Sequence, residues 1–95
     1  MIRRAADRDL EYIMQIEEIC FSSRWTKEMF LYELHENEFG HFYVLEENQK
    51  IAGFIDFWIT FECCQLANIA VHPSFQRRGY SRSLMDFMIV SAEQE

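Results

Sequence analysis

Glycine and proline are scarce in this chain of 95 residues, which contains three glycines and one proline. Such low numbers argue against long flexible linkers. Cysteine is scarce too: its number, three, is odd, and Cys63 and Cys64 are adjacent, so no disulfide framework is expected. No Cys-x-x-Cys pair occurs, so no metal site is expected either. Reduced thiols in a cytoplasmic protein fit this pattern best.

Basic residues are also few. Nine Lys and Arg residues stand against sixteen Asp and Glu residues, and the formal net charge is −7. This balance argues against a general nucleic-acid binder, which carries a basic surface. It is compatible with simple solubility, or with attraction of a cationic substrate such as an amine or a basic peptide. Of these two interpretations the charge by itself favours simple solubility, because it does not indicate any particular partner.

Long apolar runs are absent as well. No stretch approaches the length that crosses a bilayer. The first residues, Met1-Ile2-Arg3-Arg4, are not followed by the apolar segment of a signal peptide. We therefore expect a cytoplasmic protein without a membrane partner.

Apolar and aromatic side chains, in contrast, are abundant, at 49% and 16% of the residues. This content is ample for a packed core and argues against disorder. The length fits one small domain, so residues 1–95 are predicted to form a single folded unit.

The first part of the chain has the pattern of a short strand followed by two helices. A strand is predicted at residues 2–5. Apolar residues recur at helical spacing over 7–20, with Asp7 as the expected helix cap. Thr26 is expected to cap a second helix, which ends near residues 35–37.

Three strands and one helix follow. The strands are predicted at residues 41–46, 51–61 and 64–71, and a polar hairpin turn joins the first two. Both faces of 51–61 are largely apolar, which predicts a central strand covered on both sides. A helix with an apolar stripe comes last, at 79–92. The order β-α-α-β-β-β-α predicts a layered α+β (α/β) fold, with helices flanking a mixed, mostly antiparallel sheet.

The turn before the last helix carries the strongest local reversal of charge. Arg77, Arg78 and Arg82 surround the start of this helix in an otherwise acidic chain. Free amides and the positive end of the dipole at a helix start bind phosphate. Gly79 lets the backbone approach such an anion closely. The alternative is an ordinary strand-to-helix turn with solvated arginines, and this segment alone does not exclude it.

The same turn resembles a known signature. Gln76-Arg77-Arg78-Gly79-Tyr80-Ser81 is similar to the Q/R-x-x-G-x-G/A motif of the GNAT acyltransferase superfamily, and Asn68-Ile69-Ala70-Val71-His72-Pro73 resembles the strand that leads into it. Within that superfamily, four residues resemble the aromatic entry to the second helix in the ribosomal-protein-alanine N-acetyltransferase group: Phe21, Trp25, Thr26 and Phe30. The resemblance covers essentially the whole chain. Ser81 departs from the signature, which prefers glycine or alanine there.

The resemblance implies an N-acetyltransferase that uses acetyl-coenzyme A as co-substrate. In the superfamily the fourth strand is bulged, which here implies that amides around Ile69–Val71 hold the thioester and the pantetheine arm. Amides of the turn would hold the pyrophosphate. A substrate amine, such as the N-terminus of a ribosomal protein, would attack directly, without a cysteine nucleophile. The implied cofactor-binding residues are Ile69, Ala70, Val71, Gln76, Arg77, Arg78, Gly79, Tyr80, Ser81 and Arg82.

Direct attack requires a base, because the amine must be neutral. Glu62, just before the fourth strand, is the preferred candidate, and Asp56 is a weaker one. The alternative for Glu62 is a solvent-facing residue at a strand end, and alignment with the resembling group places Cys63 where that group has an acidic residue. Cys63 and Cys64 suggest covalent catalysis only weakly, because no histidine lies nearby in sequence, so buried or edge thiols are the better interpretation.

The resemblance also implies further strands and a helix after residue 95. In the resembling group that part of the fold forms the other wall of the cleft and supplies a catalytic glutamate and a tyrosine acid. Two functions therefore stand side by side: an active N-acetyltransferase, or a truncated module that binds acetyl-coenzyme A weakly or serves only as a folding or oligomerisation unit. The fourth strand would present an unpaired edge, which invites self-association.

Overall fold

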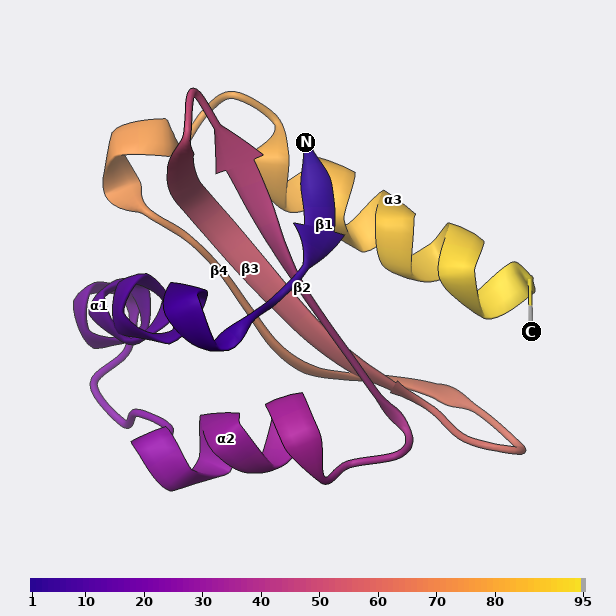
Figure 1. Cartoon of the computed structure of the whole chain (residues 1–95). Helices are drawn as coiled ribbons and strands as arrows, with labels where there is room; N and C mark the ends of the chain where they lie inside the picture. Colours follow the sequence, from indigo (N-terminus) through magenta and orange to yellow (C-terminus); the bar gives the residue numbers. More distant parts are fainter. Residues whose placement is uncertain (95) are drawn as a thin grey trace.

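The computed structural model describes residues 1–94 and contains a four-stranded antiparallel sheet with the strand order β1-β2-β3-β4. Helices α1 and α2 cover one face of this sheet and α3 covers the other (Figure 1). The layered α+β fold and its element order are confirmed. The elements are β1 (Ile2–Arg4), the short 3-10 helix η1 (Asp7–Asp9), α1 (Leu10–Cys20), α2 (Lys27–His35), β2 (Gly40–Glu47), β3 (Lys50–Ile59), β4 (Cys64–Val71), the 3-10 helix η2 (Pro73–Phe75) and α3 (Tyr80–Glu93).

The two faces of the sheet bury separate hydrophobic clusters. On the α1 and α2 side, the ring of Phe30 lies 5.9 Å from that of Phe42 and 5.9 Å from that of Phe54. On the α3 side, the buried Leu84 packs with Phe57. β3 contributes side chains to both clusters, which confirms its prediction as a central strand covered on both sides.

The helix caps agree with the sequence at one position and differ at another. Thr26 caps α2 as predicted, since its hydroxyl accepts a hydrogen bond from the Met29 amide at 3.2 Å. Asp7, however, does not cap the first helical segment, because its carboxylate lies 2.8 Å from the His35 imidazole at the end of α2. Ala6 is the residue at the N-cap of this segment, and the Asp9 carboxylate accepts from the Ala6 amide at 2.8 Å.

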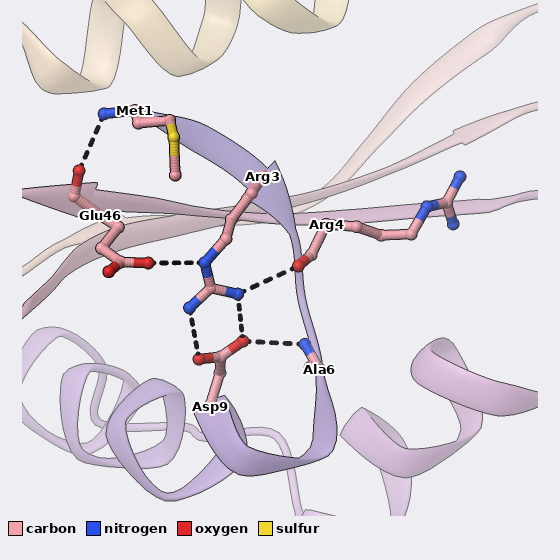
Figure 2. A network of polar contacts seen from close by, with 6 residues as sticks. All are labelled: Met1, Arg3, Arg4, Ala6, Asp9 and Glu46. Atoms are coloured by element: carbon pink, nitrogen blue, oxygen red, sulfur yellow. Dashed lines mark hydrogen bonds and ion pairs between the residues drawn. The ribbon is translucent and has the colours of Figure 1, made fainter. Parts of the chain in front are cut away.

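Asp9 also joins the network that fastens β1 to the rest of the domain (Figure 2). Arg3 donates to both Asp9 oxygens at 2.8 Å, and its Nε donates to Glu46 at 2.6 Å. Burial acts to raise the pKa of Asp9, but the hydrogen bonds from Arg3 and Ala6 outweigh it and hold the pKa below its ordinary value. The network is therefore intact at neutral pH and is lost when acid protonates Asp9.

Strand β4 is bulged, as the resemblance implied. Asp56 pairs with Asn68 and Phe57 pairs with Leu66, so Ala67 has no partner opposite it. β3 ends at Ile59 rather than at residue 61, because the Thr60 amide turns to donate to the Cys63 carbonyl at 2.9 Å. The side chain of Phe61 is consequently fully exposed at the tip of the hairpin.

Gly53 allows β3 and β4 to approach each other closely. A β-carbon at this position would lie 2.7 Å from the carbonyl oxygen of Ala70, which belongs to the backbone and cannot rotate away. We expect Gly53→Ala to lower the free energy of unfolding by about 1–3 kcal/mol, the usual cost of overpacking. Urea denaturation measures this loss. Gly40→Ala is the matched control, because its nearest contact would be 3.2 Å and its loss should be smaller. Equal losses in the two variants would contradict the prediction.

Candidate functional site

The Gln76–Ser81 turn combines two left-handed residues with the start of a helix. Arg77 has a φ of 68° and Gly79, the N-terminal cap residue of α3, has a φ of 77°. Left-handed residues that alternate with others turn successive N–H groups toward one side, which is the geometry of an anion-binding nest. The first amides of α3 add unpaired donors next to it. The turn therefore has the local shape that holds a phosphate group.

The three arginines of this region are placed differently from one another. The guanidinium of Arg78 covers the ring of Phe75, 5.3 Å from its centroid. Arg82 is exposed and lies 4.0 Å from Asp86 one turn further along α3. Arg77 is also exposed. Arg77 and Arg82 thus supply positive charge near the turn, whereas the side chain of Arg78 is held against an aromatic ring.

The turn forms one wall of a hollow of about 420 Å³, which we call the β4 hollow. The end of β4 and the end of α1 form its other walls. All the cofactor-binding residues predicted from the sequence line it, with the exception of Arg78. Its full lining is Cys20, Phe21, Ile69, Ala70, Val71, Phe75, Gln76, Arg77, Gly79, Tyr80, Ser81 and Arg82.

Three of these residues, Cys20, Phe21 and Phe75, were missed by the sequence analysis. Cys20 and Phe21 come from the end of α1, which the tertiary fold brings to β4. The Cys20 thiol donates to the carbonyl of Val71 at 3.5 Å, and burial raises its pKa above the ordinary value, so it is not a thiolate nucleophile. Phe75 lies in η2 just before the turn. Only its aromatic character next to the motif could have indicated it.

The backbone of β4 faces the hollow at alternate residues. The His72 amide donates to the Ala52 carbonyl of β3 at 2.8 Å. Because the pattern of an antiparallel ladder alternates, the backbone groups of Ala70 also point to β3, while those of Ile69 and Val71 point away from it. The Val71 carbonyl accepts from the Gln76 amide group at 3.3 Å, which agrees with this direction. The predicted set of backbone donors therefore narrows to the amides of Ile69 and Val71.

The structure does not bring Glu62 to the β4 hollow. Glu62 lies in the turn between β3 and β4, is exposed, and lines a different hollow of about 610 Å³ with Phe61. Roughly 17 Å of extended strand separate Cys64 from Ile69, and Glu62 lies beyond Cys64. Cys63 and Cys64 are exposed at this same end of the strand. A carboxylate there is too far from Ile69 to accept a proton from a group bound beside it.

Asp56, the weaker candidate base, is fully buried on the α2 side of β3. Burial first, and then the hydrogen bond and the charge of the neighbouring Glu33, together raise the pKa of Asp56 from 3.8 to about 9. Glu33 itself accepts from the Trp58 indole at 2.8 Å. An ionised Asp56 would have no donor for either oxygen among the described residues, whereas a protonated Asp56 donates to Glu33. At neutral pH Asp56 holds its proton and therefore cannot act as a base.

This raised pKa predicts how stability depends on pH. The folded chain keeps a proton on Asp56 that the unfolded chain releases above about pH 4, so stability falls as pH rises from there to about 9. Asp56→Asn removes this titration and keeps a donor for Glu33. We expect the stability of this variant relative to the unmodified chain to grow with pH, by at most about 1.4 kcal/mol per unit. Thermal melts at pH 5, 7 and 9 measure it. A pH-independent difference would contradict the assignment.

Comparison with known proteins decides the family. The profile of the acetyltransferase (GNAT) family matches residues 10–95. The chain belongs to this family. It is 32% identical over 83 residues to a Bacillus subtilis protein named for [ribosomal protein bS18]-alanine N-acetyltransferase activity, covering 87% of this chain and 55% of that protein. It is 29% identical over 85 residues to the [ribosomal protein bS18]-alanine N-acetyltransferase of Escherichia coli K12, covering 90% and 56%.

Solved structures agree with the sequence comparison. The crystal structure of the ribosomal-protein-S18-alanine N-acetyltransferase from Escherichia coli superposes with a TM-score of 0.88 at 28% identity, covering 99% of this chain and 59% of that one. An N-acetyltransferase from Thermoplasma acidophilum in complex with coenzyme A superposes with a TM-score of 0.84, covering 99% and 72%; at 17% identity it shows the shared fold alone. The chain spans about half the length of the curated relatives it matches.

The rest of residues 1–94 bears on whether the chain has a further hollow, a metal site or a membrane-spanning helix. A third hollow, of about 660 Å³, lies between α1 and the β2–β3 turn, and none of the predicted site residues lines it. Within the described part of the chain, no three His, Cys, Asp or Glu side chains gather as a metal site would require. No helix there has the length and apolar character needed to cross a bilayer.

Proposed function

We propose that the chain binds acetyl-coenzyme A in the β4 hollow and serves the transfer of its acetyl group to an amine. The observation that carries this proposal is the meeting of two kinds of backbone donor in one hollow. The nest at Arg77 and Gly79 suits a phosphate, and the outward amides of Ile69 and Val71 suit an extended amide-bearing chain. A ligand with both groups at its two ends fits this arrangement.

The pyrophosphate is assigned to the turn. The amides from Arg77 to Arg82 would hold it, and the guanidinium groups of Arg77 and Arg82 add charge. Ser81, the departure from the family signature, is exposed and lies at the second residue of α3. Its hydroxyl therefore has room, and the departure does not count against binding.

The pantetheine arm is assigned to the edge of β4, where it would run like an added strand. The carbonyl of Val71 is already engaged by Cys20 and Gln76, which leaves the amides of Ile69 and Val71 as the donors that support this proposal. A thioester supplies an activated acetyl group. A fixed amide near its carbonyl stabilises the charge that develops there when an amine attacks.

The acceptor is proposed to be the N-terminal amine of a ribosomal protein. The named relatives support this choice, since they act on the alanine terminus of protein bS18. Such an acceptor would place the chain in the cytoplasm. No Asp, Glu or His lines the β4 hollow among the described residues, so this part of the chain supplies binding and charge stabilisation rather than the base.

That same absence favours a second function, a module that binds acetyl-coenzyme A without turnover. The two functions differ in one measurement. Incubation with acetyl-coenzyme A and a peptide that begins with the bS18 terminus should yield an acetylated peptide by mass spectrometry for the enzyme. Binding without acetylated product would identify the module.

Binding itself is tested by isothermal titration with acetyl-coenzyme A. We expect Gly79→Trp to abolish the heat of binding, because a side chain there is strained at a φ of 77° and covers the nest. Arg77→Ala should weaken binding on the order of tenfold by removing one charge near the phosphates. Arg78→Ala should weaken it less, because that guanidinium covers Phe75 instead. Circular dichroism checks that each variant is folded. Undiminished binding by a folded Gly79→Trp would reject the assignment.

We also propose that the edge of β4 mediates self-association. Among residues 1–94, β4 pairs with β3 alone, and Leu66 on this strand is 39% exposed. We expect light-scattering chromatography to detect a dimer at high concentration that Leu66→Lys weakens. Val90→Lys, on the exposed side of α3, is the control and should leave the dimer intact. A monodisperse monomer at high concentration would contradict this proposal.

A further inference from the structure

Glu17 connects its own helix α1, the loop that follows this helix, and the distant strand β4. It lies on α1 and is only 2% exposed. Its Oε2 accepts from the Trp25 amide in the loop between α1 and α2 at 2.8 Å. Its Oε1 accepts from the side-chain amide of Asn68 on β4 at 2.9 Å. One buried carboxyl group thus fastens the α1–α2 loop to β4.

The point of attachment on β4 lies beside the bulge. Asn68 follows the unpaired Ala67 and is 9% exposed. Cys20, one helical turn after Glu17, contacts β4 again through the Val71 carbonyl at 3.5 Å. The two contacts from α1 therefore bracket Ile69 and Ala70. The backbone that we assign to the pantetheine arm is held at both of its ends.

We propose that Glu17 is a positioning residue for acetyl transfer. It holds the α1–α2 loop and the bulge of β4 in a fixed relation, so that the amide of Ile69 keeps its direction toward the β4 hollow. This role rests on the proposed binding of acetyl-coenzyme A at β4. Glu17 is not assigned contact with the ligand, since it does not line the β4 hollow.

The chemistry of the contact explains why a carboxyl group stands at this position. Trp25 and Asn68 each present a donor, and the two oxygens of Glu17 accept one hydrogen bond each. An apolar residue of similar size would fill the same space, but it would leave the two donors without hydrogen-bond partners. Leaving buried donors unsatisfied costs stability, so filling the space does not by itself explain why a carboxyl group stands here. The group therefore fixes a direction between the loop and the strand as well as filling volume.

An exchange of donor and acceptor tests the role. Asn68→Asp replaces the donor with a second carboxylate facing Glu17, which breaks the contact. Combining it with Glu17→Gln restores both hydrogen bonds, because the new amide at position 17 donates to the new carboxylate and accepts from the Trp25 amide. Glu18→Gln is the control, since Glu18 is exposed and does not reach β4. Each chain is titrated with acetyl-coenzyme A, and hydrogen exchange is followed at the amides of Trp25 and of Ala70, whose backbone groups point to β3.

We expect Asn68→Asp to weaken acetyl-coenzyme A binding on the order of tenfold and to accelerate exchange at Trp25 and Ala70, with α3 unaffected. The double variant should recover affinity to within about threefold of the unmodified chain. Glu18→Gln should change neither quantity. A merely structural contact would instead accelerate exchange across the whole sheet and leave the affinity of the folded chain unchanged.

The outcomes separate the two proposals. Unchanged affinity in Asn68→Asp, or no recovery in the double variant, would overturn the positioning role and leave cofactor binding standing. Absence of binding by the unmodified chain would overturn the proposed function. The exchange rates would then still decide the structural half of the inference, because equal exchange at Trp25 in all four chains would show that Glu17 does not hold the loop to the strand.

Discussion

Gly53 lets the carbonyl oxygen of Ala70 lie only 2.7 Å from the place where a β-carbon would stand, and this approach brings β3 and β4 close together. The other parts of the candidate site follow from it. The bulge at Ala67 and the alternation of the ladder leave Ile69 and Val71 facing outward. Because β4 is fixed in this way, the turn after it delivers Gly79 to the start of α3 beside the same hollow.

In this acidic protein each charged group depends on its immediate surroundings rather than on the net charge of the chain. Three of the nine basic side chains, those of Arg77, Arg78 and Arg82, lie at or beside the Gln76–Ser81 turn, where backbone donors already favour an anion. Acidic groups that are buried either find donors, as Glu17 does, or give up their charge, as Asp56 does beside Glu33. A net charge of −7 therefore describes the surface and says little about the interior or the site.

The sequence predicted the order of the elements because the apolar period, the turn residues and the Thr26 cap all agree locally. It also predicts a phosphate site at the Gln76–Ser81 turn, which stays a prediction, because this turn is built from consecutive residues. It did not predict that Asp7 leaves the start of the first helix uncapped, since the contact that draws the Asp7 carboxylate away is made with the distant His35. The raised pKa of Asp56, the orientation of Arg78 and the contacts of Glu17 depend on residues far away in the chain. No local pattern contains that information.

The network of Arg3 seen in Figure 2 has a consequence for how the domain assembles. Strands β2, β3 and β4 form a meander whose neighbours are joined by short turns, so their pairing costs little chain entropy. β1 is different, because Ile2 pairs with Leu45 across the two intervening helices. Because β1 has only three residues, it forms few backbone hydrogen bonds with β2. These few bonds do little to offset the entropy lost when so long a loop is closed. The ion pairs from Arg3 to Asp9 and Glu46 make up for this shortage, so a charged group secures the strand that closes this long loop, in addition to the packing of Ile2 against the core.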